Sequence, residues 1–270
     1  MTLSRKQREI AERHALFLEI AHEILTVEGF HVLSMERIAE LAEYSKGTVY
    51  QHFSCKEEIL VQLCNQCMQT LVSLFERAAK FDGTPRDRIS AIFHAHQLWS
   101  GIGSNQTEML QHLSMHGVKD KATEVSLLAH DQLEQRIFSC VLSIIDDAIE
   151  SGDLENTKKT TASEIVFGFW SLSTGGQLLM TSDIRLSELG VSDPANSLLK
   201  MLAHMLDGLN WQPMHVDAQF KKLLNKLNTG LFAEEFDQIR QQSEQDNEHR
   251  LGPTRSVPIS KTSKGKLVDD

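Results

Sequence analysis

The fold of this chain is decided by residues 34–58, which read SMERIAELAEYSKGTVYQHFSCKEE. Ser34 is a good N-cap for one short helix, and Ser45 can cap the next, because a serine side chain accepts a hydrogen bond from a free backbone N–H group. Within the second helix Val49 and Phe53 lie four residues apart and share an inward face. The stretch therefore predicts two short helices that pack on a core and are joined by a tight turn.

Two such helices, preceded by a longer one predicted at 5–28, form the helix-turn-helix arrangement. Its second helix lies in the major groove of DNA, and its first helix crosses the backbone. Gly47, Thr48 and Gln51 form the face opposite the buried residues. Gly47 would let the backbone approach DNA closely, whereas Thr48 and Gln51 can hydrogen-bond base edges. The motif, at about 34–53, therefore predicts a face that reads DNA sequence.

Other polar side chains flank this face, where phosphate oxygens would lie. Lys46, Tyr50 and His52 belong to the second helix or its end. Ser34 and Lys56 stand at helix starts, where free N–H groups and the positive dipole end favour a phosphate. Alternatively, His52 could cap a helix end and Tyr50 could be half-buried packing. The predicted DNA-contacting residues are Ser34, Arg37, Ser45, Lys46, Gly47, Thr48, Tyr50, Gln51, His52 and Lys56.

The composition is that of an ordinary globular protein, with 41% hydrophobic and 24% charged residues in a chain of 270. This length suffices for one large domain or two smaller ones. The net charge of -10 argues against non-specific coating of nucleic acid. A local basic patch is compatible with it, because charges act only within about 10 Å at ordinary salt.

Nothing in the sequence indicates secretion or membrane insertion. Residues 1–13 lack a hydrophobic signal core, and the longest apolar runs, such as 165–170, are too short to span a bilayer. The cysteines, Cys55, Cys64, Cys67 and Cys140, fit reduced thiols better than a disulfide framework. We therefore expect a cytoplasmic protein.

Apolar residues recur at helical spacing along most of the chain, and no sustained period-two alternation appears. We therefore expect an all-α fold. A fourth helix, capped by Ser54, should run to about Lys80. Further helices are expected at 86–100, 105–117, 121–150, 161–181, 194–210 and 216–246, the last with a break near Gly230.

The segment 29–60 resembles the DNA-binding segment of the TetR family of bacterial transcription regulators. The turn departs from the family pattern, because Glu43-Tyr44 stands where the family usually has Gly-Val. Glu43 is expected to take a left-handed conformation at some cost, and Tyr44 replaces a small apolar plug. The residues that match the family pattern in order are Gly29-Phe30, Ser34, Ile38-Ala39, Ala42, Ser45-Lys46-Gly47-Thr48, Tyr50, His52-Phe53 and Lys56-Glu57.

The resemblance implies a DNA-binding domain at 1–58 and a helical ligand-sensing and dimerisation domain at 59–246, followed by a tail at 247–270 that we expect to be disordered. Helices 161–181 and 194–210 would form a dimer interface, although their apolar residues could also be plain core. The implied function is that of a homodimeric repressor that binds a palindromic operator in double-stranded DNA and is released by a small molecule. The alternatives are a transcription activator and a regulator whose second domain docks a protein partner. An enzyme is not expected.

Several aromatic residues could line a ligand pocket, although such residues at helical spacing are more often plain core. His112 and His116 lie at i, i+4 and could bind a metal, but no neighbouring ligand completes the set. Cys64 and Cys67 lie inside a predicted helix, where packing is the simpler interpretation. We therefore expect no metal and no cofactor. The candidate ligand-binding residues are Phe93, Trp99, Met109, His112, Phe138 and Trp170.

Overall fold

The computed structural model describes residues 4–103, 106–114, 117–155 and 160–250, and these ranges contain helices, turns and loops but no strand. The predicted all-α fold is confirmed. Its main helices are α1 (Arg5–Val27), α2 (Met35–Leu41), α3 (Lys46–Tyr50), α4 (Lys56–Ala79), α5 (Pro85–Ile102), α6 (Gln106–Leu113), α7 (Glu124–Ser151), α8 (Ala162–Thr181), α9 (Pro194–Gly208), α10 (Asp217–Lys226) and α11 (Ala233–Arg250). Shorter helical turns are η1 (Lys119–Lys121), η2 (Leu186–Leu189) and η3 (Leu227–Leu231).

Local capping chemistry explains most helix ends. Ser34 and Ser45 are the N-caps of α2 and α3, and their side chains accept hydrogen bonds from the backbone N–H groups of Arg37 and Thr48. Gly152 takes a left-handed conformation, with φ of 79°, and ends α7. These ends were predictable because each depends on residues close in sequence.

Two predictions about the helices near the motif are corrected by the structure. Cys55, rather than Ser54, is the N-cap of α4, and no side-chain hydrogen bond closes this end. The hydroxyl of Ser54 instead lies 3.7 Å from the Cys55 sulfur. The helix predicted at 105–117 is the shorter α6, which ends at Leu113.

The C-terminal helices follow the prediction with one extension. A π-helical turn, η3, separates α10 from α11 and includes Gly230, where a break was predicted. Helix α11 continues to Arg250, past the predicted domain end at 246. The rest of the predicted tail, 251–270, lies outside the described residues.

A first core holds α1, α2 and α3 against the start of α4. Phe17 and Ile24 of α1, Ile38 of α2 and Val49 of α3 are at most 1% exposed, and Leu60 of α4 is fully buried with them. Because these side chains come from four helices, α3 is fixed to the head as a rigid element. We refer to α1–α3 with the first two turns of α4 as the head.

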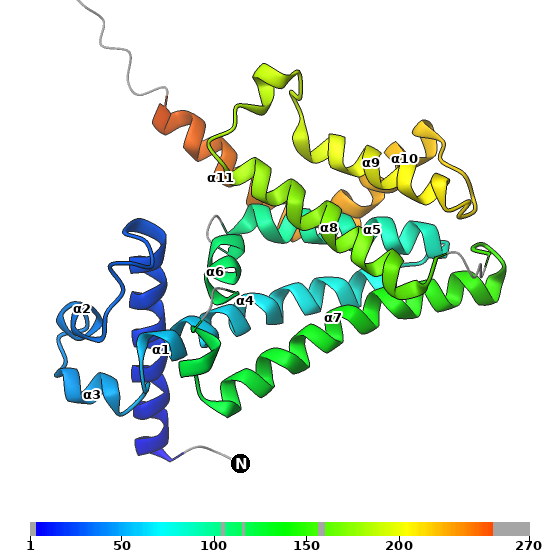
Figure 1. Ribbon diagram of the computed structural model, residues 1–270. Coiled ribbons are helices and arrows are strands. Elements are labelled where there is room, and N and C mark those ends of the chain that lie inside the picture. The colour runs from blue at the N-terminus through cyan, green and yellow to red at the C-terminus, as the bar shows by residue number, and fades with distance from the viewer. Residues whose placement is uncertain (1–3, 104–105, 115–116, 156–159, 251–270) are drawn as a thin grey trace, which may run out of the picture.

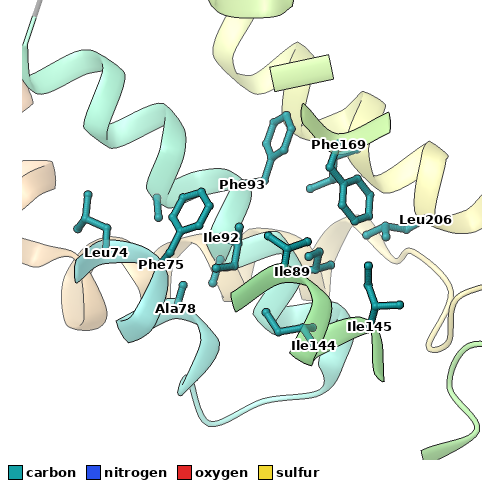
Figure 2. Packing of buried hydrophobic residues seen from close by; sticks show 14 of the residues in the cluster. Leu74, Phe75, Ala78, Ile89, Ile92, Phe93, Ile144, Ile145, Phe169 and Leu206 are labelled. Atoms are coloured by element: carbon teal, nitrogen blue, oxygen red, sulfur yellow. The ribbon is translucent and has the colours of Figure 1, made fainter. Parts of the chain in front are cut away.

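A second, larger core lies between α4, α5, α7, α8 and α9, which we call the body. Figure 2 shows Phe75 of α4 close to Ile92 of α5, and Ile144 and Ile145 of α7 below Ile89 of α5. The buried guanidinium of Arg86 on α5 also donates to the carbonyl of Ala203 and to the carboxylate of Asp207 on α9, at 3.0 and 2.6 Å. Burial of apolar area dominates the stability of this core.

Helix α4 belongs to both cores and connects them. Its residues 59–64 pack in the head, whereas 71–78 pack in the body. In Figure 1, α4 and α7 run side by side from the blue head to the far end of the molecule. A change in the tilt of α4 would therefore move the head relative to the body, whichever residue is taken as the boundary between the two proposed domains.

Candidate DNA interface and ligand cavity

Helix α3 presents the predicted face outward. Val49 is fully buried and Phe53 is nearly so, whereas Gly47 and Gln51 are exposed and Thr48 is partly exposed. The helix is anchored at its start, because the Ser45 hydroxyl accepts from the Thr48 N–H group at 3.1 Å and lies 2.8 Å from the Thr48 hydroxyl. The outward residues are thus held on a rigid and accessible surface.

The unusual turn before α3 adopts the expected left-handed conformation, with Glu43 at φ of 57°. It stays tight, because the Tyr44 N–H group donates to the Ala39 carbonyl at 3.0 Å. The Tyr44 ring is not an internal plug. It lies edge-on to the Phe17 ring, with centroids 5.5 Å apart, and the Arg13 guanidinium lies 5.3 Å from its centroid. The larger residue therefore covers the core from outside and leaves the turn in place.

Two of the predicted DNA-contacting side chains are held in exposed ion pairs. Lys46 pairs with Glu36, and this contact lowers the pKa of the Glu36 carboxyl. Arg37 pairs with Glu28 at 3.4 Å and with Glu40 at 3.2 Å. Exposed pairs of this kind contribute little to stability. A phosphate can therefore replace the carboxylate at small cost.

His52 packs against aromatic rings, a role that differs from both the predicted phosphate contact and the alternative of a helix cap. Its ring lies edge-on to Phe17, with centroids 5.2 Å apart, and 5.6 Å from the ring of His14. Burial lowers the pKa of His52, which disfavours the charged form that would bind a phosphate. Tyr50, in contrast, is exposed. Lys56 makes a cation–π contact, with its ammonium 4.6 Å from the centroid of the Phe30 ring.

A cavity of about 270 Å³ lies in the body between α4, α5, α6, α7 and α8, with Lys119 of η1 at its wall. Its lining is mainly apolar. Four of the six candidate ligand-binding residues lie in this wall, and these are Phe93, Trp99, Phe138 and Trp170.

The other two candidates, Met109 and His112, lie outside the lining. Helix α6 turns Thr107, Leu110 and Gln111 toward the cavity, a spacing that leaves Met109 and His112 on another face. Met109 is buried in the core of the head, and the His112 ring stacks on that of Phe30 with centroids 5.0 Å apart.

Polar side chains interrupt the apolar wall in two places. His96 on α5 lies 2.7 Å from the Ser173 hydroxyl on α8. On α7, His130 and Glu134 line the wall near Lys119. The sequence interpretation missed His130 and Glu134, although Ser126, His130 and Glu134 follow one another at intervals of four residues and so share one helix face.

The half-buried imidazole of His96 predicts an acid-sensitive fold. Burial lowers the pKa of His96 from its ordinary value of 6.5 to about 4, so the unfolded chain binds this proton more readily than the folded one. The associated stability is complete above pH 6.5 and is lost as the pH falls toward 4, a loss of up to about 3 kcal/mol. Urea unfolding at pH 5 and 7.5 should show a smaller pH dependence in His96→Asn, which keeps an acceptor for Ser173. An equal pH dependence in both proteins would contradict this assignment.

The cysteines and the metal candidates carry no assembled site in the described ranges. No three His, Cys, Asp or Glu side chains there are grouped as metal ligands, and His116 lies outside those ranges. Burial raises the pKa of the Cys64 and Cys67 thiols, that of Cys67 to about 11, which disfavours the reactive thiolate. None of the described helices is long and apolar enough to cross a membrane.

A short capped helix on a small helical head, with Gly47, Thr48 and Gln51 on its outward side, has the geometry of a helix-turn-helix motif. Residues 17–63 match the profile of the family described as bacterial regulatory proteins, tetR family. This segment is thus similar to the DNA-binding part of the TetR family of transcription regulators, and the two kinds of relatives described next share sequence or fold with the rest of the chain.

Curated relatives cover different shares of the chain. The transcriptional activator FasR of Mycolicibacterium smegmatis is 33% identical over 84 residues, which are 31% of this chain and 38% of that protein. The chain thus spans about two fifths of FasR. The fatty acid metabolism regulator protein of Bacillus subtilis is 23% identical over 162 residues, which are 58% of this chain and 78% of that protein.

Solved structures share the fold. FadR from Bacillus subtilis, in complex with stearoyl-CoA, matches with a TM-score of 0.54 and 17% identity over 75% of this chain and 100% of that chain. A tetR-family regulatory protein from Rhodococcus RHA1 matches with a TM-score of 0.56 and 18% identity over 73% of this chain and 97% of that chain.

Proposed function

We propose that this protein is a homodimeric repressor that binds a palindromic operator in the bacterial cytoplasm and is released when a small molecule fills the body cavity. One observation carries the proposal: helix α4 connects the head, which holds the outward face of α3, with the wall of the cavity. The same helix thus touches both the DNA-reading element and the ligand space.

The outer face of α8 and α9 supports the dimer. Phe167 is 68% exposed, and Leu178 and Met201 are about half exposed. Gly168 on α8 serves a contact within the chain. A Cβ atom on Gly168 would lie 2.4 Å from Met205, so the small residue allows α9 of the same chain to approach. The apolar residues outside this contact are left for a second copy, which would place two α3 helices on a two-fold operator.

The cavity supports a mainly apolar ligand. Its walls are built from aromatic and aliphatic side chains, and its polar groups are few. The Bacillus subtilis relative whose structure holds stearoyl-CoA has the same fold. We therefore propose a long-chain acyl compound as effector, and stearoyl-CoA is the first probe to test.

Two alternatives are weighed by specific observations. A well-formed cavity favours a small molecule over a docked protein as the signal. The similarity to FasR favours a transcription activator as the second candidate, because that relative is an activator. Transcription from the operator promoter with and without the purified protein distinguishes activator from repressor.

A bulky side chain in the cavity should abolish the response to ligand. Val166 lines the cavity and is 9% exposed, so the Val166→Phe ring would occupy ligand space. We expect stearoyl-CoA to weaken operator binding of the wild type by about 5–150-fold and to have no effect on this variant. The matched control is Val125→Phe, because Val125 is 79% exposed on α7 and lies outside the cavity wall. A full response in Val166→Phe would contradict the proposed ligand site.

Removal of the base-reading side chains should relax sequence preference. Thr48→Ala and Gln51→Ala each remove a group that can hydrogen-bond a base edge, and each should reduce discrimination between operator and mutated operator by about tenfold. Melting curves should stay close to wild type, because both side chains lie on the outward face. Unchanged discrimination in both variants would refute the readout role.

A further inference from the structure

A line of buried and half-buried polar side chains crosses the contact between α4 and α7. We call it the polar seam, and its residues are Glu58, Gln62 and Asn65 of α4 and Ser126, His130 and Glu134 of α7. The spacings of three and four residues place each set of three on one helix face. The seam has one end at the cavity and the other at the head.

At the cavity end, His130 is 2% exposed and is held between two partners. Asn65 donates from its amide nitrogen to the Ser126 carbonyl at 2.9 Å, so its amide oxygen must be the acceptor that faces His130 Nδ1 at 2.9 Å. His130 Nδ1 therefore carries a hydrogen. His130 Nε2 lies 3.3 Å from a carboxylate oxygen of Glu134, whose side chain is 42% exposed. The geometry is that of a buried imidazole paired with a half-exposed carboxylate.

In the middle of the seam, the carboxylate of Glu58 caps the N-terminus of α7. It accepts from the Thr123 N–H group at 2.7 Å, from the Ser126 hydroxyl at 2.5 Å and from the Gln62 amide at 2.7 Å. Burial alone would raise the pKa of Glu58, but these hydrogen bonds outweigh it and lower the pKa. An ionised carboxylate at a helix N-terminus is favourable. It ties the position of α7 to that of α4.

At the head end, the seam reaches the recognition helix through α1. The Gln62 amide nitrogen is used on Glu58, so the Gln62 oxygen accepts from His14 Nε2 at 2.9 Å. The His14 ring stacks on the Phe53 ring, with centroids 4.5 Å apart and planes at 26°. Phe53 follows the end of α3, so an uninterrupted series of contacts runs from the cavity wall to the DNA-reading element.

We propose that the polar seam transmits occupancy of the cavity to α3, with His130 as the positioning residue. A ligand that draws the half-exposed carboxylate of Glu134 away removes one partner of the buried His130 ring. His130 then loses its fixed orientation toward Asn65, and α4, α7 and α1 shift relative to one another. A ligand can act this way only by its different affinity for the two arrangements. The inference rests on the proposed function and deepens it by naming the route of regulation.

The simpler interpretation is that the seam only stabilises the packing of α4 on α7. The two interpretations differ in which helices are destabilised by a substitution at Glu134. Transmission predicts faster amide hydrogen exchange in α1 and α3. Simple stabilisation predicts faster exchange that is confined to the α4–α7 contact or is equal over the whole protein. Hydrogen–deuterium exchange of the full chain separates these outcomes and requires neither DNA nor ligand.

The experiment compares Glu134→Gln, His130→Asn and the double variant. An asparagine at 130 has an amide nitrogen at the position of Nδ1, so it can donate to Asn65 but cannot reach Glu134. Glu134→Gln should raise exchange in α1 and α3 by about fivefold in the wild-type background and cause no further change in the His130→Asn background. Thr174→Val, which lines the cavity outside the seam, should leave α1 and α3 unchanged.

Unchanged exchange in α1 and α3, additive effects of the two substitutions, or an equal rise in α9 would each overturn the proposal. Operator affinity is measured in parallel on the same proteins. If the wild type binds no DNA, the proposed function fails. The exchange result still tests whether the polar seam couples Glu134 to α1 and α3. If the wild type binds operator and Glu134→Gln shifts neither affinity nor exchange, the seam fails alone.

Discussion

The Gly47→Leu variant should fold at least as stably as the wild type and bind operator about 100-fold more weakly. Gly47 is exposed, and a Cβ atom there would meet only the Ser45 hydroxyl, at 3.8 Å, so the protein itself has room for a side chain. Leucine also favours a helix over glycine by about 0.8 kcal/mol. On the DNA side, the same side chain would hold the backbone of α3 away from the groove in both half-sites of a dimer.

Melting curves and gel retardation on the same preparations test this prediction. Gly208→Leu is the matched control, because Gly208 is also an exposed helical glycine with open surroundings and lies at the end of α9, on the body. Loss of DNA binding with retained stability would place Gly47 at the groove. Wild-type affinity in Gly47→Leu would mean that another surface of the head meets DNA.

The second large effect is expected at the outer face of α8. Phe167→Glu should convert the dimer into monomers and lower operator affinity by about 100-fold or more, because a charge buried in an apolar interface without a partner is costly. Phe167 is 68% exposed in the single chain, so the substitution should leave the monomer folded. One α3 helix then reads only a half-site.

Sedimentation velocity and gel retardation measure the two consequences together. Val125→Glu carries the same change at a residue that is 79% exposed on α7, outside α8 and α9, and should leave both quantities unchanged. A Phe167→Glu protein that stays dimeric would locate the interface elsewhere. A monomer with full operator affinity would remove the need for a dimer.

The features that the sequence predicted well depend on neighbours within about four residues. Ser34 and Ser45 cap their helices, Val49 faces inward, and Glu43 adopts the left-handed turn, because each outcome is decided by local backbone geometry. The outward position of Gln51 follows from the same helical period.

The features that the sequence interpretation missed depend on contacts between segments that are far apart in the chain. His130 faces Asn65, and these residues lie 65 positions apart, so the seam appears only once α4 and α7 are packed together. The phosphate contact of His52 stays a prediction, but the sequence did not indicate that its ring packs edge-on to the ring of Phe17 on α1. Met109 is a similar case, since the short helix α6 turns it toward the head rather than the cavity.

The most direct test of the central claim is selection of binding sites from random double-stranded DNA by the purified full chain, followed by footprinting of the enriched sequence. We predict an inverted repeat whose half-sites are spaced by about one helical turn or a multiple of it, both protected by one dimer. Enrichment of a single unrepeated half-site would contradict dimeric recognition. No enrichment over the starting pool, at salt low enough for phosphate contacts to form, would contradict sequence-specific DNA binding itself.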